Sequence, residues 1–257
     1  MRTITIFNQK GGVSKTTTTA TLCAGLSYRG YKVLAVDLDA QENLTTISAV
    51  EPGSNKATVL DILTREATAE EAITHASGYD IIPGTERLAN VGSILTATGK
   101  EYRLKEALKP LADKYDYVII DCPPALDILT IAALTASDSC IIPAQADYLT
   151  LKAIDQLANT IADIQTYTNK ALTVNGILIT RYNARTIIAS NIVSEIEKQA
   201  ELLHTAVYNV KIRECVAVRE AQLLQQDIFA YAKYSNASID YNAFIDEFLT
   251  RDKATAI

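Results

Sequence analysis

Short apolar runs and helical patterns alternate along this chain from its beginning to its end. Such runs are typical of strands buried on both faces of a sheet, and the amphipathic stretches between them are typical of covering helices. The predicted strands are residues 3–8, 32–37, 79–83, 117–121, 139–143, 173–180 and 206–210. Strands and helices that alternate in this way predict an α/β fold with a doubly wound, mostly parallel sheet flanked by helices.

Turn-forming residues refine this pattern at two places. The helix predicted over residues 16–29 ends at Gly30, and glycine is a common C-terminal stop. Residues 51–57, rich in Pro, Gly, Ser and Asn, are predicted to form a surface loop. We find no internal repeat, low-complexity tract or flexible linker, so we expect a single domain over residues 1–257.

The composition predicts one body with a large core. The 257 residues are 48% hydrophobic and carry a net charge of −6. A negative net charge gives no general attraction to nucleic acid, so any DNA binding must use a local patch of basic side chains. No apolar stretch reaches the roughly 18 residues that a membrane helix needs, and no signal-peptide pattern precedes the first strand. We therefore expect a cytoplasmic protein.

A glycine-containing loop joins the first predicted strand to the first predicted helix. It consists of Lys10, Gly11, Gly12, Val13, Ser14, Lys15, Thr16 and Thr17. In such a loop, backbone N–H groups surround a phosphate, one lysine reaches the terminal phosphates, and a threonine hydroxyl holds magnesium. Lys15 and Thr16 suit the last two roles. The usual pattern G-x-x-x-x-G-K-[ST] fails because Gln9 and Ser14 replace its glycines, whereas K-G-G-x-x-K-[ST] fits.

Acidic side chains stand at the carboxyl ends of two other predicted strands, where ligands bind in open α/β sheets. Asp121 ends an apolar strand and is predicted to hold a magnesium-bound water while the metal bridges two phosphates. Asp37 and Asp39 end the second strand two positions apart, which places both carboxylates on one side of an extended segment. We expect one of them to support the metal shell and the other the attacking water.

Four motifs in a fixed order give the chain a family resemblance. They are NQKGG at residues 8–12, VDLDAQ at 36–41, VIIDCPP at 118–124 and IPAQ at 142–145. With these motifs the chain resembles the deviant Walker-A ATPases, and specifically the ParA or Soj partition ATPases, over nearly its whole length. The resemblance implies a magnesium-dependent ATPase that hydrolyses ATP to ADP and phosphate, with ATP and Mg²⁺ as its cofactors.

The resemblance also assigns roles to individual side chains. The implied catalytic residues are Lys10, Lys15 and Asp39, with Asp39 as the hydrolysis residue. The implied metal-binding residues are Thr16, Asp37 and Asp121. Because Lys15 already serves the phosphates of its own subunit, Lys10 is implied to reach across an ATP-induced homodimer and stabilise charge on the partner's phosphates, as an arginine finger acts in trans. Loss of the γ-phosphate would then release the dimer.

Base and DNA contacts follow from the resemblance as well. Relatives carry an Ile-Pro-Arg-Asn segment near the adenine, where this chain has KIRE at residues 211–214, so Ile212 and Arg213 are implied as base contacts. Relatives also bind DNA without sequence preference through basic side chains on the dimer face. The DNA-binding candidates here are Arg181, Arg185, Arg219 and Lys233, with Arg213 as a further one. Ala217 stands where a DNA-contacting arginine of relatives is expected.

The sequence disfavours three related classes of ATPase. A MinD-type protein needs a basic amphipathic C-terminal helix for the membrane, but residues 241–249 are acidic on their polar side. Longer partition proteins carry an N-terminal helix-turn-helix that binds an operator. Because few residues precede the phosphate loop here, we expect no such module and no autorepression through it. A nitrogenase-type iron protein needs cysteines for a shared cluster, whereas those of this chain are far apart and are expected to be reduced thiols. They are Cys23, Cys122, Cys140 and Cys215.

These observations predict an ATP-dependent partition switch in the cytoplasm, associated with the nucleoid. We expect ATP and magnesium to join a sandwich homodimer, the dimer to coat DNA non-specifically, and a ParB-type centromere-binding protein to trigger hydrolysis and release. One alternative is a related ATPase that positions a non-DNA cargo as an assembly scaffold. Another is a metabolic P-loop ligase or synthetase that phosphorylates a small carboxylate, which would have no use for Lys10.

Overall fold

A seven-stranded sheet forms the centre of the computed structural model, which describes residues 1–51, 57–183 and 187–255. The strands are β1 (Arg2–Ile6), β2 (Val33–Asp37), β3 (Thr74–His75), β4 (Asp80–Ile82), β5 (Tyr117–Asp121), β6 (Ser139–Gln145) and β7 (Thr173–Thr180). They lie in the order β3-β4-β2-β5-β1-β6-β7, and each pairing in this sheet is parallel except that of β3 with β4. The predicted α/β class with a mostly parallel sheet is confirmed.

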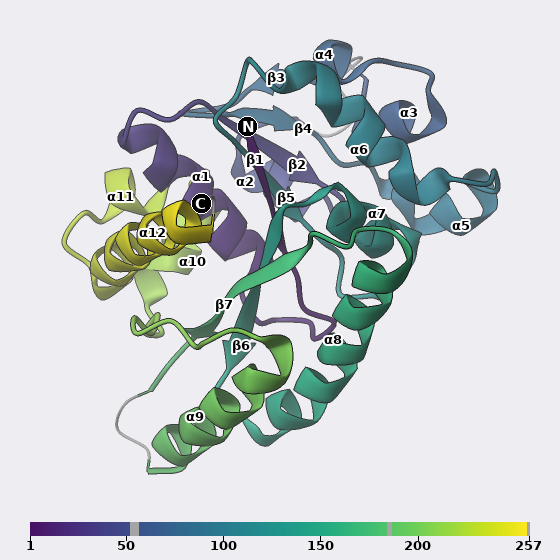
Figure 1. Cartoon of the computed structure of the whole chain (residues 1–257). Helices are drawn as coiled ribbons and strands as arrows, with labels where there is room; N and C mark the ends of the chain where they lie inside the picture. Colours follow the sequence, from purple (N-terminus) through teal and green to yellow (C-terminus); the bar gives the residue numbers. More distant parts are fainter. Residues whose placement is uncertain (52–56, 184–186, 256–257) are drawn as a thin grey trace.

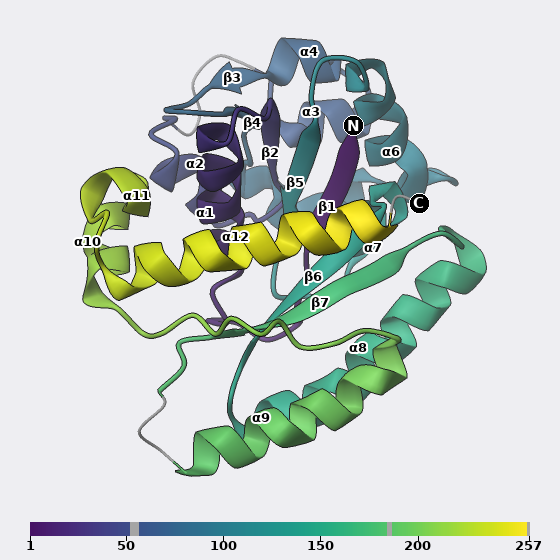
Figure 2. The ribbon, with the colours of Figure 1, turned by 60° about the vertical axis from the view of Figure 1, so that its left-hand side comes forward.

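Helices cover both faces of the sheet (Figure 1). They are α1 (Lys15–Tyr28), α2 (Asn43–Ile47), α3 (Val59–Thr64), α4 (Ala69–Ala72), α5 (Val91–Ile94), α6 (Arg103–Leu108), α7 (Ile128–Ala136), α8 (Tyr148–Tyr167), α9 (Ile187–Ala200), α10 (Val216–Leu223), α11 (Ile228–Tyr231) and α12 (Asn236–Thr255). Figure 2 shows the long helix α12 crossing the sheet on the side of α1, with α10 and α11 beside its first turns, while α8 and α9 lie next to each other below β7.

Alternate residues of the central strands supply a separate core for each face, because successive side chains of a strand point to opposite sides. The strand residues packed with α1 and α12 are Ile4, Ile6, Ala35 and Ile119. Those packed with α3, α6 and α7 are Leu34, Val36, Val118 and Ile120. Burial on both faces explains why these strands are nearly continuous apolar runs in the sequence.

The prediction of a strand over residues 206–210 is wrong. This segment runs beside β7 but makes only an isolated bridge between Val207 and Ile177. Further along, polar contacts replace strand pairing, because the backbone N–H groups of Asn209 and Val210 donate to the carboxylate of Glu247 in α12. The short strand β3 was missed, since two residues give no apolar run. The surface loop predicted over residues 51–57 lies mostly outside the described residues.

The carboxyl ends of the parallel strands meet at one edge of the sheet, and this edge collects the residues that the sequence marked. Asp37 of β2 is the register partner of Asp121 of β5, which in turn pairs with Ile6 at the end of β1. The phosphate loop follows β1 directly and leads into α1. Three motifs that are far apart in the sequence therefore meet in space.

Candidate nucleotide-binding site

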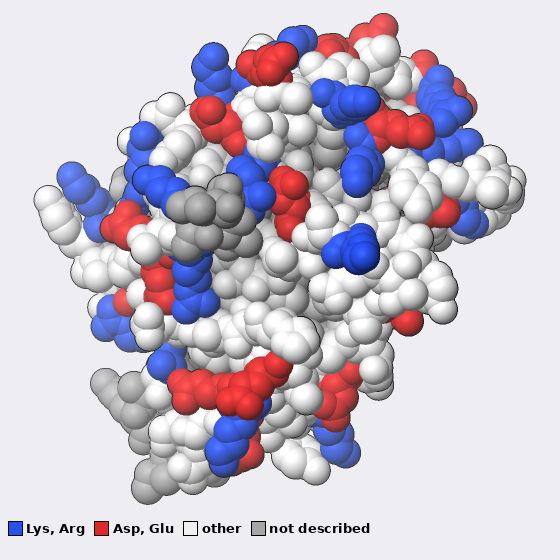
Figure 3. All heavy atoms as spheres, viewed as in Figure 1, with Lys and Arg blue, Asp and Glu red and all other residues white. Residues whose placement is uncertain are grey.

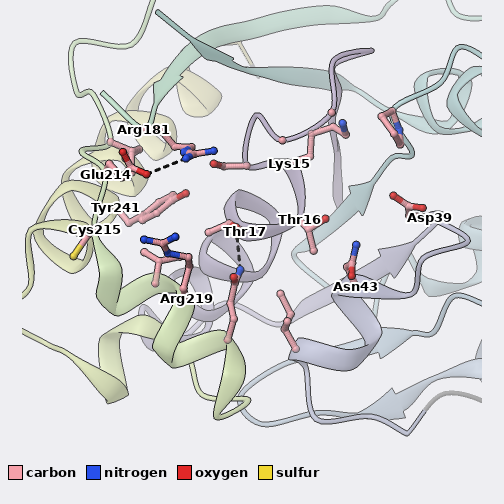
Figure 4. Close-up of a pocket in the computed structure, with 18 of the residues that line it drawn as sticks. Lys15, Thr16, Thr17, Asp39, Asn43, Arg181, Glu214, Cys215, Arg219 and Tyr241 are labelled. Atoms are coloured by element: carbon pink, nitrogen blue, oxygen red, sulfur yellow. Dashed lines mark hydrogen bonds and ion pairs between the residues drawn. The ribbon is translucent and has the colours of Figure 1, made fainter. Parts of the chain in front are cut away.

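A cavity of about 560 Å³ opens at this edge of the sheet (Figure 4). Its walls come from the phosphate loop, the segment after β2, the end of β7 and helices α2, α10 and α12. The lining residues are Gly11, Gly12, Ser14, Lys15, Thr16, Thr17, Asp39, Gln41, Asn43, Ile47, Pro124, Arg181, Ile212, Arg213, Glu214, Cys215, Val218, Arg219, Gln222 and Tyr241. Most of the predicted nucleotide-binding residues are therefore brought together around one space.

The phosphate loop is a left-handed turn held by side chains of other strands. Gly12 has a φ of 74° and Ser14 a φ of 66°, so the loop needs two residues in a region that side chains disfavour. The Gln145 amide donates to the Gly12 carbonyl at 2.8 Å, and the Thr180 hydroxyl donates to the Val13 carbonyl at 3.0 Å. The side chain of Val13 is fully buried beneath the loop.

Lys15 is the first residue of α1 and is 7% exposed. Its ammonium donates to the Lys10 carbonyl at 3.0 Å. Burial lowers the pKa of Lys15, and the nearby Asp121 carboxylate offsets part of that effect. A buried cation at the start of a helix, beside free backbone N–H groups, is an arrangement that binds phosphate.

Asp121 is fully buried and accepts hydrogen bonds from two hydroxyl groups of α1, Thr16 Oγ1 at 2.6 Å and Thr19 Oγ1 at 3.2 Å. Burial and then the neighbouring Asp37 carboxylate raise the pKa of Asp121 to about 8. A hydroxyl oxygen and a buried carboxylate form the hard-oxygen donor set that Mg²⁺ prefers, and the nearby Lys15 only partly offsets the rise in the pKa of Asp121. Thr16 and Asp121 therefore fit a magnesium ion.

The two aspartates after β2 occupy different places. Asp39 lines the cavity, whereas Asp37 is fully buried behind it. The Asp37 carboxylate accepts from the Thr45 N–H at 2.9 Å, the Thr45 hydroxyl at 2.7 Å and the Asp39 N–H at 3.1 Å. Burial raises the pKa of Asp37 to about 6, against the effect of these hydrogen bonds. In the described structure Asp37 thus holds the backbone of Asp39 and the start of α2, and its predicted role as a metal ligand stays a prediction.

Lys10 does not point into the cavity of its own subunit. Its ammonium donates to a carboxylate oxygen of Asp147, the residue that caps the N-terminus of α8 by accepting from the Thr150 N–H at 2.9 Å. Burial acts to raise the pKa of Asp147, but the hydrogen bonds from Lys10 and from Thr150 outweigh it and lower the pKa below its ordinary value. The two lysines of the phosphate loop therefore have different surroundings.

The arginines assigned to base or DNA contacts mostly lie at the other end of the cavity. Arg213 donates to Asp240 through Nε at 2.8 Å and Nη2 at 2.6 Å, while the apolar side chain of Ile212 is buried beside it. Arg181 pairs with Glu214 at 2.9 Å.

The remaining DNA candidates differ in position. Arg219 lines the cavity. Lys233 is exposed, with its ammonium 5.9 Å from the ring centre of Tyr234. Arg185 lies outside the described residues. On the face shown in Figure 3, basic and acidic side chains are interspersed.

Sequence reasoning missed the contribution of α10 to the cavity wall. The Gln222 amide donates to the Thr17 hydroxyl at 2.9 Å and so joins this helix to the phosphate-loop helix. Asn43, the first residue of α2, was missed as well. The usable signal was the spacing of Val218, Arg219 and Gln222, which places all three on one helical face.

Comparison with known proteins agrees with this geometry. A family model described as an AAA domain matches residues 1–174. The sporulation initiation inhibitor protein Soj of Bacillus subtilis is 40% identical over 93% of this chain and 94% of its own length. The chromosome partitioning protein ParA of Myxococcus xanthus is 34% identical over 98% of this chain and 89% of its own.

One similar solved structure contains a bound nucleotide. Cobyrinic acid a,c-diamide synthase from Mycobacterium smegmatis, with bound ADP and magnesium, superposes with a TM-score of 0.85 at 33% identity. The superposition covers 99% of this chain and 96% of that one. Within the described residues, no helix is both long and apolar enough to cross a membrane.

Proposed function

This chain belongs to the ParA and Soj family of P-loop ATPases, and from that premise we propose that it is an ATP-driven partition switch. ATP with magnesium joins two subunits, the dimer binds DNA without sequence preference, and a ParB-type partner stimulates hydrolysis and release. The observation that carries the proposal is the position of Lys10, a phosphate-loop lysine that the cavity of its own subunit does not use.

The residues at the phosphate end of the cavity divide the chemistry among them. Lys15 and the N-terminus of α1 hold the phosphates, and Asp39 orients the attacking water as the hydrolysis residue. Thr16 and Asp121 would hold a magnesium ion, which would neutralise charge on the phosphates. Asp37 positions Asp39 through the hydrogen bond from the Asp39 N–H.

The dimer contact is proposed beside Lys10. The next helix, α8, begins with Tyr148 and Leu149, which are 63% and 62% exposed. Exposed apolar side chains that directly follow Asp147, the partner of Lys10, suit a surface that is covered when two phosphate loops face each other. For Lys10 to reach the partner's phosphates it must leave Asp147, so nucleotide on the partner competes with that carboxylate for one ammonium.

The dimer proposal is tested with Lys10→Ala. The parent chain is expected to sediment as a dimer with magnesium and a non-hydrolysable ATP analogue, and as a monomer with ADP. Lys10→Ala is expected to bind the analogue with the parent affinity, because Lys10 does not line the cavity of its own subunit, and to stay monomeric, because the contact in trans is lost. Lys170→Ala, which removes an exposed lysine beyond the far end of α8, serves as the control. Equal dimerisation of the parent and Lys10→Ala would refute the trans contact.

The DNA proposal is tested by co-sedimentation with duplex DNA of random sequence at low salt, where phosphate contacts are strongest. Co-sedimentation is expected with the ATP analogue and not with ADP. The alternative in which the ATPase positions a non-DNA cargo predicts a nucleotide-dependent dimer without co-sedimentation. This result would replace the DNA part of the proposal and leave the dimer intact.

The structural likeness to a synthase supports a second candidate function, that of a metabolic ligase or synthetase. In that case a small carboxylate would be activated in the cavity, and ATP turnover would require it. We prefer the switch because a ligase needs only Lys15 at the phosphates. Turnover that depends on an added carboxylate and is the same in Lys10→Ala and in the parent would favour the ligase.

A further inference from the structure

The nucleoside end of the cavity contains three arginines, Arg181, Arg213 and Arg219, and two of them are already paired. Arg213 is held by Asp240 and Arg181 by Glu214. Among the described residues, no carboxylate lies within ion-pair distance of Arg219. The cavity wall therefore includes one guanidinium whose charge the described part of the protein does not neutralise.

The direction of Arg219 follows from the helix that holds it. Residues on one face of a helix recur at intervals of three and four, and Val218, Arg219 and Gln222 of α10 all line the cavity. Gln222 fixes this face toward the phosphate-loop helix through its hydrogen bond to Thr17. Figure 4 shows Arg219 at the same end of the cavity as Tyr241, opposite the end formed by Asp39.

We infer that Arg219 binds the nucleoside part of the nucleotide and is not a DNA contact. This inference rests on the proposed nucleotide-binding function and adds a residue to it. A guanidinium offers five N–H donors in a plane and stacks on flat rings, so it can bind ribose hydroxyls or cover a base. Lys15 and α1 serve the phosphates at the opposite end, which leaves the nucleoside for Arg219.

The position of Arg219 also differs from that of another DNA-binding candidate, Lys233. Arg219 and Lys233 are both exposed, but Arg219 lies on the cavity wall that faces the phosphate loop, where a bound nucleotide would cover it. Lys233 lies off the cavity wall, against the ring of its neighbour Tyr234. The two basic residues that the sequence placed in one DNA-binding set are therefore separated by function.

The test measures the affinity of Arg219→Ala and Arg219→Gln for a non-hydrolysable ATP analogue and for inorganic triphosphate, with magnesium, by calorimetry. Affinity for the analogue is expected to fall roughly tenfold, as for the loss of a hydrogen bond from a charged group. Affinity for triphosphate is expected to stay at the parent value, because that ligand has no nucleoside. Lys233→Ala is the control and is expected to bind both ligands as the parent does.

Three results would overturn the inference. They are an unchanged affinity for the analogue, an equal loss of affinity for triphosphate, and a loss of DNA co-sedimentation in Arg219→Ala at saturating analogue while nucleotide affinity is unchanged. The affinity measurements contain no DNA and no partner protein, so failure of the DNA proposal leaves their outcome readable. A failure of all variants and of the parent to bind nucleotide would instead count against the proposed function.

Discussion

The two ends of the cavity are built in different ways. The phosphate end consists of strand ends, a tight loop and fully buried polar groups such as Asp37 and Asp121. The opposite end, which we propose holds the nucleoside, contains ion pairs such as Arg181–Glu214, in which both side chains are at least half exposed. Buried groups at the first end have fixed partners, so substitutions there affect chemistry and stability. Exposed groups at the second end are expected to affect affinity alone.

The largest expected effect separates rate from affinity. Asp39→Ala is expected to lower ATP hydrolysis by about 100-fold or more, because a residue that orients the attacking water typically contributes this much. Its affinity for a non-hydrolysable analogue is expected to match the parent, whereas Arg219→Ala is expected to show the reverse pattern. Single-turnover hydrolysis and calorimetry on both variants measure the difference. Parallel losses in both quantities for both variants would abolish the distinction between the two ends.

The next effect concerns stability. Thr45→Val removes the hydroxyl that donates to Asp37 and that accepts from the Gly84 N–H at 2.9 Å. Asp37 would lose one of its three hydrogen bonds and the Gly84 N–H would lose its partner, so the free energy of unfolding is expected to fall by about 2 kcal/mol in urea denaturation. Thr46→Val, at an exposed position of the same helix, is the matched control and is expected to have little effect.

The same measurement extends to the nucleoside end. Glu214→Gln breaks an ion pair whose side chains are 50% and 54% exposed, so the free energy of unfolding is expected to change by less than about 1 kcal/mol. A loss as large as that of Thr45→Val would show that both ends of the cavity are equally important for folding, contrary to the comparison.

A smaller effect is expected where the phosphate end meets the proposed partner. Asp147→Asn weakens the hold on Lys10 but keeps a side chain that caps α8. A partly exposed ion pair contributes up to about 1 kcal/mol, so the dimerisation constant with the ATP analogue is expected to rise up to about fivefold for each of the two subunits. Asp155→Asn, exposed on the same helix, is the control. Weaker dimerisation of Asp147→Asn in analytical ultracentrifugation would show that Asp147 supports the dimer instead of competing with it.

The smallest expected effect lies within the phosphate loop. Ser14 has a φ of 66°, a conformation that costs a residue with a side chain about 1–2 kcal/mol, and glycine avoids most of this cost while losing about 0.5–1 kcal/mol of chain entropy. Ser14→Gly is therefore expected to raise the free energy of unfolding by less than about 1 kcal/mol. Gly12→Ala, with a φ of 74° at the changed residue, is expected to lower it instead. Urea denaturation of the pair gives both signs.

How far the sequence predicted the structure differs between the same two ends. The phosphate loop, Asp39 and Asp121 were found because short contiguous motifs follow apolar strands, and parallel strands end at one edge. The end formed by residues 181, 212–222 and 241 combines distant segments with only helical spacing in common, so the sequence did not show that Arg181 and Arg219 line the same cavity as Arg213. The strand predicted over residues 206–210 failed for a related reason, since an apolar run does not specify whether its backbone pairs with a strand or with the side chains of a helix.

The anchoring of the phosphate loop has a thermodynamic consequence. Because Gln145 and Thr180 each hold one of its carbonyl groups, the ordering entropy of this turn is spent during folding and not on the arrival of the nucleotide. Capture of the triphosphate should then proceed without a slow closing step, so any lag in activation has to arise later, when a second molecule arrives.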